Sequence, residues 1–270
     1  MEPCAALRYG WRMTQIVQPV GALLREWRQR RRLSQLDLAS EAEISTRHLS
    51  FLETGRALPS RDMVLHLSER LEIPLRERNV LLVAAGYAPV FRERSLADPE
   101  LQAARAAMEL VLAAHAPNPA IAIDRHWTLV AANRSVAPLL AGVDAELLKP
   151  PVNVLRLSLH PKGLAPRIVN LAEWRAHLLE RLRRQVDVSA DAVLVELLKE
   201  LRAYPAPVQP HKANGAGVVV PFKLRHGDRV LSFLSTTTVF GTPVEITLSE
   251  LALESFFPAD AETAEAVKGL

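Results

Sequence analysis

The strongest constraint on the fold is a run of short helical patterns between Gly21 and Gly86. Apolar residues recur there three or four positions apart, as in Leu23 and Trp27, which is the spacing of one buried helix face. Between the patterns stand residues that favour helix starts or helix ends. The start signals are Ser34, Ser45 and Pro59-Ser60, and the end signals are Gly55 and Gly86. The sequence therefore predicts an all-α N-terminal domain of five helices over residues 20–88.

Residues 33–56 combine these signals in the order expected of a helix-turn-helix. Ser34-Gln35 begins one helix and Ile44-Ser45 makes the turn to the next. In that next helix, Leu49 and Leu52 share one face and are expected to be buried against the first two helices. The stretch resembles the phage-repressor-type helix-turn-helix of the xenobiotic response element (XRE) regulators. This resemblance implies that the chain binds a double-stranded DNA operator.

The opposite face of this recognition helix is predicted to enter the major groove. Its N-terminal residues meet base edges in this fold, so we expect Arg47 to read a guanine and Phe51 to touch a thymine methyl. Thr46 is a further candidate for a base contact. Phosphate contacts are expected from Gln35, Ser45, His48, Ser50 and Arg56. Structural roles stay open beside these: a helix cap for Gln35, a core position for Phe51, and solvent for Arg47.

The charge distribution agrees with a DNA-binding N-terminal half. Residues 1–94 hold 15 of the 33 basic residues but only 11 of the 30 acidic ones. Five arginines crowd the first helix, as expected of a segment that faces phosphate, although a solvated helix face explains them equally well. These are Arg25, Arg28, Arg30, Arg31 and Arg32. One short recognition helix reads few bases, so we also expect a homodimer on a two-fold-related site.

The remaining chain alternates between helical and strand patterns and predicts a second, α+β domain with an antiparallel sheet. Residues 1–19 are expected to be an N-terminal tail, residues 89–98 a linker, and residues 99–270 the second domain. Helical patterns cover residues 99–115, 135–140, 171–184, 190–203 and the end of the chain after Pro258. Strand patterns cover residues 121–123, 128–131, 217–224, 230–239 and 244–248, the last alternating strictly between apolar and polar residues.

The chain as a whole resembles the MmyB-like transcription regulators, in which an XRE-type head is joined to a ligand-binding domain of PAS-like architecture. The matching segments are residues 47–56, 75–79, 84–89, 119–127, Ala132-Asn133, 153–156, Trp174 and 258–263. The resemblance implies a pocket for a small apolar ligand, such as a fatty acid or similar lipid. In a PAS-like fold this cavity is expected between sheet and helices, lined by aliphatic residues of 218–248 and 171–182.

Four residues of the second domain are candidates for ligand contacts. Arg156 is the first choice, because a carboxylate needs a fixed cation and arginine can bind it with two hydrogen bonds. Trp127 and Trp174 are candidates for the pocket wall, and Asn133 for a further contact. Each also allows a structural role: an ion pair for Arg156, core positions for the tryptophans, and a helix cap for Asn133.

Composition and motifs argue against several other classes of protein. The sequence is 49% hydrophobic and 23% charged, typical of a globular chain, and it contains no apolar run of membrane-spanning length. Cys4 is the only cysteine, which fits a reducing compartment and leaves no cysteine-cluster metal site. The sequence has no His-Glu-x-x-His motif, phosphate loop or nucleophile elbow. We therefore expect a cytoplasmic bacterial regulator without catalytic residues, metal or required cofactor.

Two hypotheses for the second domain follow. In the first, a small apolar ligand binds there and changes how the chain binds its operator. In the second, this domain only dimerises or binds a protein partner, and no small-molecule ligand exists. A closed apolar pocket with one polar end favours the first hypothesis, whereas a flat apolar patch on a solid core favours the second.

Overall fold

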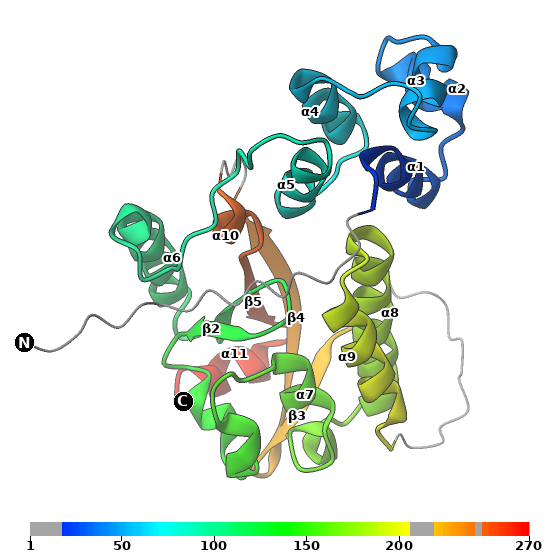
Figure 1. Ribbon diagram of the computed structural model, residues 1–270. Helices are drawn as coiled ribbons and strands as arrows, with labels where there is room; N and C mark the ends of the chain where they lie inside the picture. The colour runs from blue at the N-terminus through cyan, green and yellow to red at the C-terminus, as the bar shows by residue number, and fades with distance from the viewer. Residues whose placement is uncertain (1–17, 206–218, 241–244, 270) are drawn as a thin grey trace, which may run out of the picture. The chain divides into compact units, whose positions relative to one another are not determined.

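The computed structural model describes residues 18–205, 219–240 and 245–269 (Figure 1). Its internal contacts divide the chain into two compact units, Met1–Val90 and Phe91–Leu270. Each unit has a hydrophobic core of its own.

The described part of the N-terminal unit contains the five predicted helices. They are α1 (Val20–Arg30), α2 (Gln35–Glu41), α3 (Thr46–Glu53), α4 (Arg61–Arg70) and α5 (Leu75–Ala84). The predicted start signals are confirmed, because Ser34, Ser45 and Ser60 each accept a hydrogen bond from a backbone N–H of the following turn. Gly55 and Gly86 follow α3 and α5 with φ of +73° and +85°, the left-handed conformation that favours glycine.

A close approach of two helices fixes the start of α1 against the end of α3. A Cβ atom at Gly21 would lie 2.2 Å from the carbonyl oxygen of Leu52, so no larger residue fits at this position without a backbone shift. Leu24, Leu38, Leu49 and Leu52 are fully buried nearby in the core of this unit. The recognition helix α3 is therefore packed tightly against α1 and α2.

The C-terminal unit is built on a five-stranded antiparallel sheet, which confirms the predicted α+β class. Its strands are β1 (Ala120–Ile123), β2 (Leu129–Ala132), β3 (Phe222–His226), β4 (Arg229–Val239) and β5 (Ala252–Pro258). The spatial order is β2-β1-β5-β4-β3. The strand that comes last in the sequence thus occupies the centre of the sheet, between β1 and β4.

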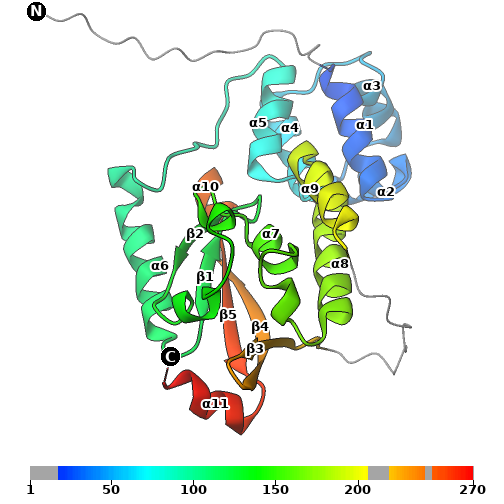
Figure 2. The same ribbon diagram turned by 90° about the horizontal axis from the view of Figure 1, so that it is seen from below.

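Helices cover both faces of this sheet (Figure 2). On one face Met108 and Leu112 of α6 (Gln102–Ala114) pack on Ala120, Ala122 and Leu253. The larger core lies on the other face, beneath α7 (Val154–Leu159), α8 (Leu171–Ser189) and α9 (Ala192–Ala203). The remaining helices are α10 (Ile246–Ser249), α11 (Ala261–Val267) and the short 3-10 helices η1 (Pro99–Leu101), η2 (Ala137–Leu140), η3 (Ala145–Leu148) and η4 (Ala165–Arg167).

Two predicted strands need correction. Residues 244–248 were expected to form a strand, but the described part of this segment leads into the one-turn helix α10. The Glu245 side chain accepts a hydrogen bond from the Leu248 N–H and caps that helix, so a local bond overrides the alternating pattern. The strand predicted over residues 217–224 begins only at Phe222, and residues 217 and 218 lie outside the described residues. The central strand β5 was not predicted.

The middle of the expected linker is bound to α10. The Ile246 N–H donates to the carbonyl oxygen of Arg92 over 2.9 Å, and the Arg94 N–H donates to Glu245 Oε1 over 2.8 Å. The Thr247 hydroxyl donates to the carbonyl oxygen of Arg94 over 2.5 Å. Residues 92–94, which follow the N-terminal unit in the sequence, are therefore held by the C-terminal unit.

Candidate DNA interface and ligand pocket

The outer face of helix α3 carries the residues predicted to contact bases. Leu49 and Leu52 are fully buried, whereas Arg47 is exposed and Thr46 and Phe51 are half-buried. The face opposite the core therefore carries the side chains predicted to enter the major groove, together with Ser50. Their contacts with DNA stay a prediction.

Phe51 lies between two cations. The guanidinium carbon of Arg47 is 5.3 Å from the centre of the Phe51 ring, and that of Arg56 is 5.8 Å from it. Both distances are typical of cation–π contacts. Phe51 is thus not a core residue: it holds two arginines beside the outer face of α3.

Gln35 and Ser45 each have a structural partner in the N-terminal unit. Gln35 Nε2 donates to Glu53 Oε2 over 2.8 Å, and the Ser45 hydroxyl accepts from the His48 N–H over 3.1 Å. These bonds anchor the starts of α2 and α3. The phosphate contacts expected of Gln35, Ser45 and His48 stay predictions beside these roles.

A buried ion pair joins α1 to the end of the recognition helix. Arg28 donates from Nε to Glu53 Oε1 over 2.6 Å and from Nη2 to Glu53 Oε2 over 2.8 Å. Burial disfavours the charge on Glu53, but the hydrogen bonds from Arg28 and Gln35 outweigh it and lower the pKa of this carboxyl. Arg28 is only 8% exposed, so the expectation that it faces phosphate is wrong.

The other arginines of the predicted basic run divide into two groups. Arg31 donates to the carbonyl oxygens of Leu71 and Glu72, and Arg30 pairs with Glu26. Arg25 and Arg32 are exposed. The basic run is therefore partly structural, because burial and tertiary hydrogen bonds remove some of its members from the surface.

An apolar cavity of about 110 Å³ lies in the C-terminal unit between the sheet and the helices that cover its larger core. Much of its wall comes from the β1–β2 hairpin, η2 and α7. The lining residues from these segments are Ile121, Trp127, Leu129, Leu139, Leu140, Val154, Leu155, Leu157 and Ser158. From the ranges in which the wall was expected, the described lining residues are Leu178, Arg181, Phe222 and Leu224. The expected place of the cavity thus agrees with the structure, but most of its expected wall does not.

One part of the cavity wall carries an ion pair, and we call this part its polar end. Arg181 of α8 pairs with Glu254 of β5, and its Nη2 also donates to the Thr237 hydroxyl over 2.7 Å. The Thr237 hydroxyl donates in turn to Glu254 Oε1 over 2.9 Å. The Arg181 guanidinium carbon lies 4.7 Å from the centre of the Trp127 ring. Arg181, Glu254 and Trp127 all line the cavity, so an ion pair and an indole close its polar end.

The structure places the predicted ligand residues differently. Trp127 lines the cavity, and its Nε1 donates to Gln185 Oε1 over 2.7 Å. Trp174 does not line the cavity, but its Nε1 donates over 3.0 Å to the hydroxyl of Ser158, which is a lining residue.

The other two candidates also lie outside this lining. Arg156 makes a bidentate pair with Glu200, and its side chain is 45% exposed. Asn133 is buried, and its side chain bonds to backbone groups of Ala120, Leu112 and Asn118. Arg156 thus has the ion pair that was kept open for it, whereas the Asn133 side chain does not cap the following helix and instead joins three backbone segments.

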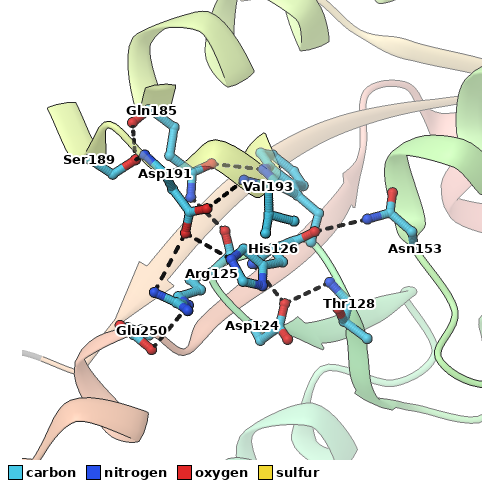
Figure 3. A network of polar contacts seen from close by, with 11 residues as sticks. Asp124, Arg125, His126, Thr128, Asn153, Gln185, Ser189, Asp191, Val193 and Glu250 are labelled. Atoms are coloured by element: carbon cyan, nitrogen blue, oxygen red, sulfur yellow. Dashed lines mark hydrogen bonds and ion pairs between the residues drawn. The ribbon is translucent and has the colours of Figure 1, made fainter. Parts of the chain in front are cut away.

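A polar network joins the hairpin turn beside Trp127 to α8, α9 and α10 (Figure 3). His126 Nε2 and Asp191 Oδ2 are 2.8 Å apart, and Arg125 lies 3.5 Å from Asp191 and 3.7 Å from Glu250. Burial disfavours the charge on Asp191, but hydrogen bonds and nearby cations outweigh it and lower the pKa of this carboxyl. Glu250 directly follows α10, so the network connects the cavity wall to the helix that holds residues 92–94.

Two protein-family models match this chain, one for each domain. Residues 104–270 match the model of the MmyB-like transcription regulator ligand binding domain. The chain belongs to this family. Residues 19–81 match a helix-turn-helix domain, so the MmyB-like chain is a DNA-binding transcription regulator. A search of curated proteins found no match.

The residues that close the polar end of the MmyB-like cavity were missed in the sequence. Arg181 lies in a charged stretch of α8 that reads as a solvated helix face, and Glu254 lies in a strand that was not predicted. The one available signal was a lone glutamate among apolar residues in Ala252–Pro258. A buried charge needs a partner, but the sequence alone does not say which arginine supplies it.

Two further kinds of feature are missing from the described residues. No helix there is long and apolar enough to cross a membrane. The same residues contain no group of three or more His, Cys, Asp or Glu side chains arranged to hold a metal ion.

The buried pair in the N-terminal unit yields a stability prediction. Glu53→Gln should destabilise the protein at neutral pH by about 3 kcal/mol, because it leaves the buried Arg28 cation without a counter-ion. The Glu53 pKa is lowered in the folded state, so the stabilisation exists above the unfolded-state pKa and is lost as pH falls through the folded-state value. Denaturant unfolding at several pH values should show the variant's deficit shrinking in acid. A deficit that does not change with pH would contradict the assignment.

Proposed function

We propose that this transcription regulator is ligand-responsive, with an apolar, acyl-like molecule binding in the cavity of its MmyB-like domain and changing its affinity for an operator. The observation that carries the proposal is the cavity itself, whose wall is almost entirely apolar and includes one ion pair. An apolar cavity lined by a few polar groups favours small-molecule binding over a solid core that only supports a protein interface.

The cavity size favours a short chain in the arrangement described. A buried apolar cavity of about 150 Å³ can hold benzene, and this cavity measures about 110 Å³. Each methylene that leaves water contributes about 0.8 kcal/mol, so a chain of several carbons would bind usefully. A chain of eight or more carbons would require the wall to move outward, most easily at the half-buried Leu140 and Val154.

The contacts around the cavity offer a route by which a ligand could act on the rest of the chain. Trp127 lines the cavity and directly follows Arg125 and His126, which bind Asp191 and Glu250. Glu250 follows α10, which holds residues 92–94. A ligand that moves Trp127 would therefore shift the segment through which the two units are joined. We propose that this changes how a homodimer presents its two recognition helices to a two-fold-related site.

The DNA-reading part of the proposal is tested by Arg47→Ala. The variant should lose about 1 to 3 kcal/mol of discrimination at one base position while keeping weak, salt-sensitive binding, because phosphate contacts remain. Selection from randomised DNA sites, carried out on wild type and variant, measures this directly. An unchanged base preference in the variant would contradict the role of Arg47, whereas uniform loss of binding would assign Arg47 to phosphate.

The ligand-binding part is tested by calorimetry with straight-chain alcohols and acids of graded length. Affinity should rise with each added carbon until the chain fills the cavity, and Leu140→Trp should remove binding by filling it instead. Arg156→Met is the matched control, because Arg156 lies outside the lining and this change should leave affinity unaltered. No binding of any probe to the folded, delipidated protein would favour the interaction-module hypothesis.

A further inference from the structure

The charge at the polar end of the cavity is already balanced. Glu254 lies on the central strand and is only 4% exposed, so its carboxylate needs a cation close by. Arg181 supplies that cation, and Thr237 bonds to both partners. The ion pair therefore adds no net charge to the site.

Among the described residues, the groups beside this pair add no spare cation. Burial lowers the pKa of His177, and the nearby Arg181 charge lowers it further, so the imidazole is neutral at physiological pH. Its ring is stacked on Trp174, with the two ring centres 5.5 Å apart. Arg184 is 73% exposed and pairs with Glu180 over 2.9 Å.

A carboxylate entering this cavity would meet Glu254 as a second anion beside a single arginine. The pair would then leave one buried negative charge uncompensated, which is costly in an apolar site. An uncharged hydroxyl or amide carries no such cost. It can accept a hydrogen bond from the guanidinium, which has five N–H donors, and can donate to Glu254 or to the Ser158 hydroxyl.

We propose that the cavity selects an apolar ligand with an uncharged hydrogen-bonding end, such as an alcohol or an amide, and discriminates against the free carboxylate of the same chain. This inference rests on the proposed function, because it needs a ligand in the cavity. It also gives the Arg181–Glu254 pair a role in specificity: Glu254 neutralises the arginine that would otherwise attract anions.

The test uses three probes of equal chain length, 1-octanol, octanamide and octanoate, titrated into the full-length protein by calorimetry. At pH 8 octanol and octanamide should bind at least about tenfold more tightly than octanoate, because the octanoate head is charged. Between pH 8 and pH 6 octanoate affinity should rise about tenfold per pH unit, since only its neutral acid binds. Octanol affinity should stay constant over the same range. Octanoate that binds wild type at pH 8 as tightly as octanol overturns the proposal.

Glu254→Gln should reverse the preference for an uncharged head group, because it leaves the positive charge of Arg181 without its carboxylate partner. The variant should prefer octanoate to octanol at pH 8. Glu200→Gln is the matched control, because it breaks the surface pair with Arg156, and it should keep the wild-type preference. If Glu254→Gln does not fold, the comparison of octanol with octanoate in wild type, and its pH dependence, still test the proposal. Binding of none of the three probes to wild type overturns the proposed function, and this inference with it.

Discussion

The buried carboxylate of Glu254 is the constraint on which the C-terminal domain depends. It lies on the central strand β5, and hydrogen bonds to β1 and β4 prevent this strand from rotating about its axis. The cation that it requires comes from α8, so Arg181 fixes that helix over the sheet. The same guanidinium lies against Trp127 and so joins the hairpin turn to the helix. Strand, helix and turn together define the polar end of the cavity.

The N-terminal domain uses the same kind of interaction for a different purpose. Glu53 closes the recognition helix and is held by Arg28 and Gln35. Replacing such a pair with apolar residues is often neutral or stabilising, so its value lies less in stability than in geometry. Together with the close approach at Gly21, it fixes the angle of α3 to α1 and α2. The base reading proposed for α3 needs such a fixed support, because small displacements would move Arg47 out of reach of a base.

The parts of this protein that depend on local physics could be predicted from its sequence. Three of the five N-terminal helices begin where predicted because Ser34, Ser45 and Ser60 cap them through bonds within one turn. The central strand and the polar end of the cavity could not be predicted. Arg181 and Glu254 are separated by 73 positions, and no local pattern shows that they meet. Arg156 was the more plausible anion binder in the sequence, but the fold turns it toward Glu200.

The central claim is that occupancy of the cavity controls operator binding through the network that ends at α10. The most direct test of this claim measures the operator affinity of the full-length protein with and without saturating 1-octanol. It compares wild type with Arg125→Met. Arg125 joins the hairpin turn to Asp191 and Glu250 but does not line the cavity. The account predicts that octanol changes wild-type operator affinity by about fivefold or more, and that operator changes octanol affinity by the same factor. In Arg125→Met that factor should fall toward one, while octanol binds as before. An equal factor in both proteins, or none in the wild type, would contradict the account.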